Sequence, residues 1–129
     1  AWVPLDELVT SDIPAADVCL GGPFGGTPQS LRVITSKTSQ CLALGKATVI
    51  GAIDEDTGFV DKYNCLLVPQ ADACALASTL RWAFAHRDDL PAIGLRARTL
   101  YDERLSVHHI ARQLIPPLLN LRAYHHGKP

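Results

Sequence analysis

The residues best placed to do chemistry lie in the segment VITSKTSQCLALGKATVIG, residues 33–51, where a loop leads into a helix. Ser36, Lys37 and Thr38 stand where that helix is expected to begin. The first amides of a helix have no partner within it and carry a partial positive charge, so they suit an anion such as a diphosphate. Lys37 would add a full charge. A capped helix end with a solvated lysine explains the same residues, and the residues alone do not choose between the two.

A loop rich in glycine and proline, GGPFGGTPQ, precedes this helix at residues 21–29. Gly25 and Gly26 would let the backbone approach a ligand closely, because they carry no side chain. The glycine spacing is that of neither a dinucleotide-binding fingerprint nor a phosphate-binding P-loop. A plain flexible turn is therefore an equally good interpretation of the loop.

Other groups of chemically active side chains have simpler explanations. The acidic run at residues 54–56 reads as a solvated loop, and a metal bound there is the weaker alternative. His108 and His109 are adjacent near a helix start, so their side chains point in different directions and do not share a ligand. We expect the protein to bind neither a metal nor another cofactor.

Predicted strands and helices alternate along the chain, and together they must position the loop and the helix described above. Continuous apolar runs predict buried strands, and each is followed by a segment with helix-start signals such as Asp72, Pro91 and Ser106. The strands are predicted at 16–22, 46–52 and 64–69, and the helices at 36–44, 72–85, 91–104 and from 106 onward, with a further helix after Pro4. Pro116 and Pro117 predict that the last helix kinks or ends there. This alternation is typical of a parallel sheet covered by helices on both faces, an α/β fold.

Composition limits the remaining possibilities. The chain has 129 residues, 47% of them hydrophobic, and a net charge of −1, which suits one ordinary domain and excludes the basic footprint of a dedicated nucleic-acid binder. It has no apolar run of about 20 residues that would span a bilayer. The four cysteines, at 19, 41, 65 and 74, lie in apolar segments without C-x-x-C pairing, so we expect buried free thiols in a reduced, cytoplasmic protein.

An ordered series of segments resembles a known family. The segments that carry the resemblance are WVPLDEL, ADVCLGG, VITSKTSQCLALGKATVIG, NCLLVPQADACALASTL and LYDERLSVHHIARQL. The series is similar to the C-terminal, nucleotide-sugar-binding domain of group 1, retaining GT-B-fold glycosyltransferases. The resemblance covers residues 1–121 as a partial domain and leaves 122–129 as a tail. It implies a three-layer Rossmann-like sheet, the second half of that domain. It also implies contacts to the donor's phosphates from Gly25, Gly26, Thr35, Ser36, Lys37 and Thr38.

Two positions depart from the family pattern. The family carries two glutamates eight positions apart, and the corresponding residues here are Arg32 and Gln40. Gln40 offers both an acceptor and a donor to the ribose hydroxyls, and Arg32 offers a contact to phosphate or sugar. The resemblance identifies no catalytic residue. It leaves an alternative open, in which the parent protein is a glycosyltransferase-like binding or scaffold protein without activity.

The resemblance also implies what lies outside this chain. Family members have basic residues on earlier loops of the domain and an N-terminal domain that binds the acceptor. We therefore expect a retaining enzyme that moves a sugar from a nucleoside-diphosphate sugar to a polysaccharide or glycolipid precursor, with this chain alone inactive. The sheet edge left uncovered predicts self-association.

Overall fold

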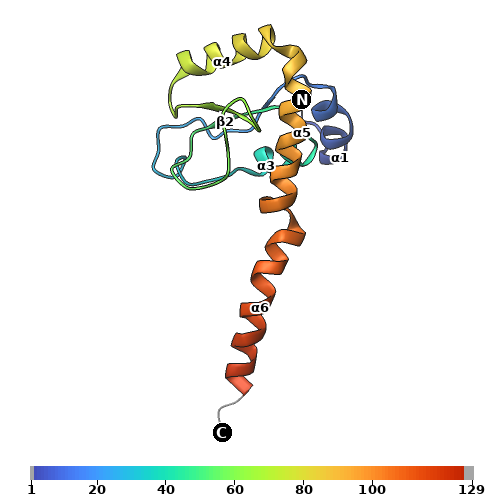
Figure 1. Cartoon of the computed structure of the whole chain (residues 1–129), viewed down its shortest axis with the longest axis vertical. Helices are drawn as coiled ribbons and strands as arrows, with labels where there is room; N and C mark the ends of the chain where they lie inside the picture. The colour runs from blue at the N-terminus through green and yellow to red at the C-terminus, as the bar shows by residue number, and fades with distance from the viewer. Residues whose placement is uncertain (1, 127–129) are drawn as a thin grey trace.

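The centre of the protein is a parallel sheet of three short strands (Figure 1). The computed structural model describes residues 2–126, and their side chains from residue 2 to residue 121. The strands are β1 (Cys19–Leu20), β2 (Thr48–Gly51) and β3 (Leu66–Val68), in the order β1-β2-β3. Cys19 pairs with Thr48, and Val49 pairs with Leu66. The expected parallel sheet is thus confirmed, although its strands are shorter than the apolar runs that predict them.

Helices cover both faces of this sheet, as the sequence predicts. On one face, α4 (Ala73–Ala85) packs through Leu76, Leu80 and Ala83 against a cluster that contains Val49 and Leu66. On the other face, α3 (Ser36–Ala43) and α5 (Leu90–Leu100) pack around Ile50. Figure 1 shows α4 on one side of the sheet and α3 on the other, with α5 running past the sheet between them, so that Leu90 and Ile93 of α5 belong to the cluster on the α4 side. Successive residues of β2 therefore serve opposite layers, as a pleated strand requires.

The remaining helical elements complete the chain. After Pro4, one continuous helical stretch consists of α1 (Leu5–Glu7), the π-helix η1 (Leu8–Asp12) and α2 (Ile13–Ala15). The 3-10 helix η2 (Arg87–Asp89) precedes α5, and the π-helix η3 (Tyr101–Leu105) links α5 to α6 (Val107–His126).

The predicted helix caps are present. The Asp72 carboxylate accepts the amide of Ala75 at 2.8 Å, and the Ser106 hydroxyl accepts the amide of His109 at 3.2 Å. Each of these bonds satisfies a donor at a helix start that has no partner in its own helix.

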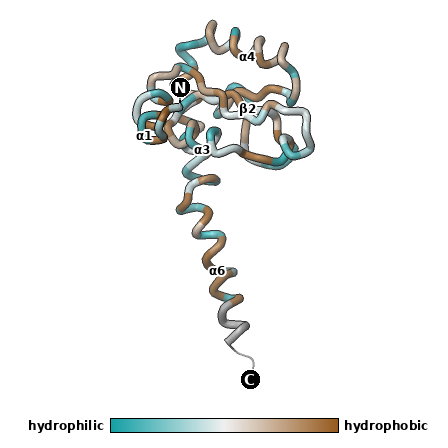
Figure 2. The backbone as a smooth tube through the Cα atoms, turned by 180° about the vertical axis from the view of Figure 1, so that it is seen from behind, coloured by the Kyte–Doolittle hydropathy of each residue, from teal (hydrophilic) through white to brown (hydrophobic). Residues whose placement is uncertain are grey.

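Helix α6 projects away from the rest of the protein (Figure 1). Of the two alternatives predicted at Pro116 and Pro117, a kink or an end of the helix, the end is wrong, because the helix continues through both residues to His126. The prolines remove two amide donors, and the turns on either side still form. Its apolar side chains are largely exposed. Figure 2 shows hydrophobic residues as brown segments along the projecting part. Within residues 2–126, no helix combines the length and the apolar character that crossing a membrane needs.

The four cysteines are free thiols in the structure. Cys19, Cys41 and Cys65 are buried, as expected from their apolar segments. Cys74 is exposed on the first turn of α4, so the expectation of burial is wrong for that residue. The reason is helical spacing, because Leu76, Leu80 and Ala83 form the packed side of α4 and Cys74, two residues before Leu76, lies on a different face.

Candidate functional site

The candidate site is the first half of α3, which the structure fixes to the carboxyl end of β1. Thr35 caps the helix, since its hydroxyl oxygen accepts the amide of Thr38 at 3.2 Å. The same hydroxyl donates to the carbonyl oxygen of Gly21 at 2.7 Å, directly after β1. The first bond within the helix runs from the amide of Ser39 to the carbonyl oxygen of Thr35. The amides of Ser36 and Lys37 therefore have no intrahelical partner.

The side chain of Thr38 strengthens this attachment from inside the protein. Its hydroxyl donates to the carbonyl oxygen of Gly22 at 3.1 Å and lies 3.0 Å from the hydroxyl of Thr35. A Cβ atom on Gly21 would lie 2.5 Å from the Thr38 hydroxyl oxygen, so only glycine fits at that position. Thr35 and Thr38 thus use their hydroxyls within the protein, and they place the start of α3 beside the loop that follows β1.

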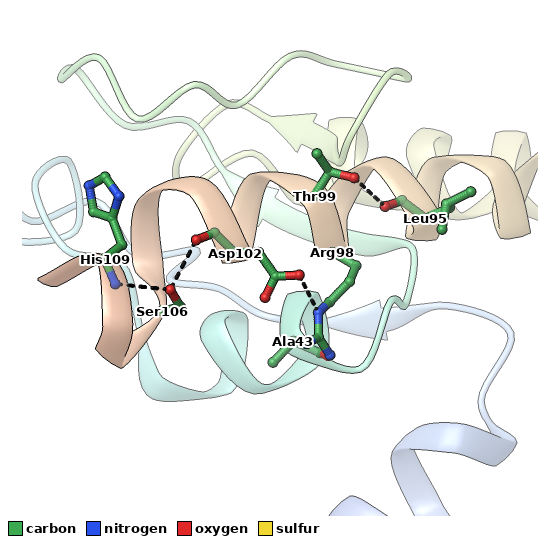
Figure 3. A network of polar contacts seen from close by, with 7 residues as sticks. All are labelled: Ala43, Leu95, Arg98, Thr99, Asp102, Ser106 and His109. Carbon is green, nitrogen blue, oxygen red and sulfur yellow. Dashed lines mark hydrogen bonds and ion pairs between the residues drawn. The ribbon is translucent and has the colours of Figure 1, made fainter. Parts of the chain in front are cut away.

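A second set of contacts fixes the far end of α3. Arg98 of α5 donates to the carbonyl oxygen of Ala43 and, at 2.8 Å, to the carboxylate of Asp102 (Figure 3). A cation at the carboxyl end of a helix also complements the helix dipole. The helix is therefore held at both ends, and its free surface is the side that carries Lys37 and Gln40.

Lys37 and Gln40 line one cavity of about 240 Å³ between α3, β1 and the helical stretch 5–15. They are three positions apart, which places both side chains on the same face of the helix. The cavity wall also contains Leu20 at the carboxyl end of β1 and the acidic residue Asp12. Lys37, Gln40 and Asp12 thus line a common space that extends along the outer side of β1, from Ala16 to Leu20.

The other predicted site residues lie outside this cavity wall. Ser36 and Arg32 are exposed, Ser36 on the first turn of α3 and Arg32 on the loop before it. Gly25 and Gly26 lie at the other end of the glycine loop, where a Cβ on Gly25 would be 4.0 Å from Ser30 and one on Gly26 would be 3.3 Å from Ala71. The glycines that adjoin the helix start are Gly21 and Gly22.

A larger cavity, of about 580 Å³, lies at the amino ends of β1 and β2, and Ala16 borders both cavities. The larger cavity is lined by three cations, each of which already has a partner. Lys46 donates to the carbonyl oxygen of Pro14 at 2.9 Å, Arg87 pairs with Asp17, and Arg98 makes the contacts described above. Because this cavity is at the amino ends of the strands and its charges are engaged, the smaller cavity beside Lys37 and Gln40 is the candidate site.

Among the described residues, no three histidine, cysteine, aspartate or glutamate side chains come close enough together to hold a metal ion. The acidic residues 54–56 are exposed, and the Asp56 carboxylate lies 3.4 Å from the Arg104 guanidinium.

Comparison with known proteins identifies the fold. No protein-family model and no curated protein matches the sequence. The solved structure of sucrose-phosphate synthase from Thermosynechococcus elongatus is similar, with a TM-score of 0.73 and 22% sequence identity. The match covers 92% of this chain and 28% of that chain, so the sequence spans only a small part of that enzyme's length. The predicted fold class, a parallel sheet with helices on both faces, is confirmed by this likeness.

Proposed function

We propose that this chain supplies the donor-binding region of a glycosyltransferase, which transfers a sugar from a nucleoside-diphosphate sugar to an acceptor. The observation that carries the proposal is the shared cavity of Lys37 and Gln40 on a helix whose first amides are free. The likeness to a sucrose-phosphate synthase supports it, because that name denotes an enzyme that joins sugars. The acceptor, a polysaccharide or glycolipid precursor, is part of the same proposal.

Each group has a role in binding the donor. The amides of Ser36 and Lys37 and the Lys37 ammonium bind the diphosphate, which carries the developing negative charge when the sugar departs. The Gln40 amide binds the ribose hydroxyls, accepting from one and donating to the other. Arg32, exposed at the end of the preceding loop, adds a cation for phosphate or sugar.

An NMR titration of the 129-residue chain with UDP, GDP and ADP tests the proposal. We expect the amide signals of Ser36 and Lys37 to shift with one of these nucleotides. Lys37→Ala should weaken binding by about tenfold, the effect of losing one charge-assisted contact. Arg81→Ala, which removes an exposed cation from α4, is the matched control and should leave binding unchanged. Shifts confined to other parts of the chain would refute the assignment.

The role of Gln40 has its own test. Gln40→Ala should weaken binding of the ribonucleotide but not of its 2′,3′-dideoxy analogue, which lacks the hydroxyls. Gln113→Ala, an exposed glutamine on α6, is the control. Equal losses for both ligands would show that Gln40 does not contact the ribose.

The presence of Arg32 and Gln40 at the positions of the family's two glutamates favours a second candidate function, a glycosyltransferase-like binding or scaffold protein without activity. The two functions differ in turnover. If the parent protein binds a nucleoside-diphosphate sugar without hydrolysing or transferring it, the scaffold function is correct. If it releases free sugar or a product, the enzyme is active despite the two substitutions.

A further inference from the structure

Two cysteines lie at the interface between β1 and α3. Cys19 belongs to β1 and Cys41 to α3, and both pack into one apolar cluster with Ile13. They are only 8% and 5% exposed, but both line the 240 Å³ cavity described above. The cavity therefore gives a small molecule a route to these two residues, although both are buried.

The surroundings of the pair differentiate the two thiols. A hydrogen bond from Cys41 lowers the pKa of Cys19 to about 7, against the opposing effect of burial and with help from the charge of Lys46. The same hydrogen bond and burial raise the pKa of Cys41, with Lys37 opposing. Asp12 is the other charged group in the cavity wall. Cys19 is thus suited to be the attacking thiolate and Cys41 the thiol that resolves the product.

We propose that Cys19 and Cys41 are a reversible redox pair, which forms a disulfide between β1 and α3 when a peroxide enters the cavity. The Cys19 thiolate attacks one peroxide oxygen and breaks the O–O bond, which leaves a sulfenic acid on Cys19 and one water after protonation. The Cys41 sulfur then attacks the Cys19 sulfur, the S–O bond breaks, and the proton of Cys41 leaves with the hydroxide as a second water. Two thiols lose two electrons, and the peroxide gains them.

The other two cysteines provide internal controls. Cys65 is fully buried, and burial together with the nearby Asp61 raises its pKa to about 12, so it is expected to stay inert. Cys74 is exposed on α4 and lies outside the cavity. Accessibility alone therefore predicts that Cys74 reacts first, whereas the proposed pair predicts that Cys19 and Cys41 become linked to each other.

The experiment is limited peroxide treatment of the full 129-residue chain, followed by acid quenching, maleimide blocking and mass spectrometry. We expect the oxidised, unfolded chain to carry two maleimides where the untreated chain carries four, peptides containing Cys19 and Cys41 to be joined, and dithiothreitol to reverse the change. Before oxidation, Cys19 should react with maleimide at pH 7 at least about tenfold faster than Cys65. The Cys65→Ala/Cys74→Ser variant should form the same link, because neither residue takes part.

The Cys41→Ala variant separates the two steps of the reaction. It should form no link but should accumulate a sulfenic acid at Cys19 that dimedone traps. Its maleimide reaction at Cys19 should slow several-fold, since the hydrogen bond from Cys41 is lost. Oxidation confined to Cys74, or wild-type chains in which Cys19 and Cys41 stay fully blockable after peroxide and unfolding, would overturn the proposal. That wild-type result does not depend on the stability of any variant.

Discussion

The Thr38 hydroxyl donates to the carbonyl oxygen of Gly22 across 3.1 Å, and the Thr38 side chain is fully buried. Thr38 and Gly22 belong to different parts of the fold, the first turn of α3 and the loop after β1. A buried carbonyl oxygen that loses its donor destabilises the folded state, because it then has a hydrogen bond neither from water nor from the protein. This contact therefore fixes where the free amides of Ser36 and Lys37 lie relative to the sheet.

Replacing Thr38 by Val should lower the free energy of unfolding by about 1 to 3 kcal/mol, because the isostere keeps the shape and leaves the Gly22 carbonyl oxygen unpaired. Urea unfolding followed by circular dichroism measures the loss. Ser36→Ala, at an exposed position in the same turn, should stay within about 0.5 kcal/mol of the wild type. Equal losses of unfolding free energy in the two variants would show that the buried hydrogen bonds of Thr38 stabilise the protein no more than the exposed side chain of Ser36 does.

Gly21→Ala should also destabilise the protein, for a steric reason. The added Cβ would lie 2.5 Å from the Thr38 hydroxyl oxygen and 2.9 Å from the Thr48 methyl carbon. Overpacking of this kind costs about 1 to 3 kcal/mol in a close-packed interior. Gly25→Ala is the control, since its new Cβ would meet Ser30 only at 4.0 Å. Thermal unfolding of both variants tests this prediction. A Gly21→Ala protein that unfolds at the wild-type temperature would contradict it.

The helices and their caps were predictable because their signals are local. Asp72 and Ser106 accept amides three residues further along the chain, so the sequence alone places both helix starts. The strands were predictable in number and direction but not in length. Their ends depend on which backbone groups find a partner on another strand, and apolar residues continue past those ends.

The site was predictable in part, for the same reason. Lys37 and Gln40 share a helix face by spacing alone, and the structure places both in one cavity. Asp12 faces that cavity from a segment far away in the sequence, and no local signal indicates this. Of the two glycine pairs in the loop, Gly21 and Gly22 adjoin α3 because Thr38 approaches them, which is a tertiary contact. The sequence analysis selects Gly25 and Gly26 instead, because no local signal reveals the contact of Thr38 with the other pair.

The buried Cys65 thiol should make stability fall in alkali. In the unfolded chain this thiol ionises near its ordinary pKa of 9.0, whereas in the folded protein burial raises the pKa to about 12. Between those values the unfolded state binds fewer protons, so rising pH favours unfolding. In Cys65→Ala this effect is absent. Urea unfolding from pH 8 to 11 should show the wild type losing stability relative to that variant by up to about 1.4 kcal/mol per pH unit above pH 9.

The matched control for Cys65 is Cys74→Ala, which removes an exposed thiol from α4. Its unfolding free energy should run parallel to that of the wild type over the same pH range. A constant difference between wild type and Cys65→Ala across this range would show that the Cys65 thiol is not buried as the structure places it.

The outer edge of β1 should make the chain self-associate. Within residues 2–126, the strand order leaves one side of β1 without a partner strand, and Leu20 on that strand is 49% exposed. An unpaired edge with an apolar side chain is a template for pairing with another chain, and a lysine on an edge strand prevents such pairing. Light scattering after size exclusion should give a mass above that of the monomer, rising with concentration, and Leu20→Lys should return it to the monomer.

Leu114→Lys removes a leucine of similar exposure, 54%, from α6 and should leave the association intact. Association that survives Leu20→Lys but disappears with Leu114→Lys would move the contact from the sheet edge to the projecting helix, and a monomer at every concentration would exclude both.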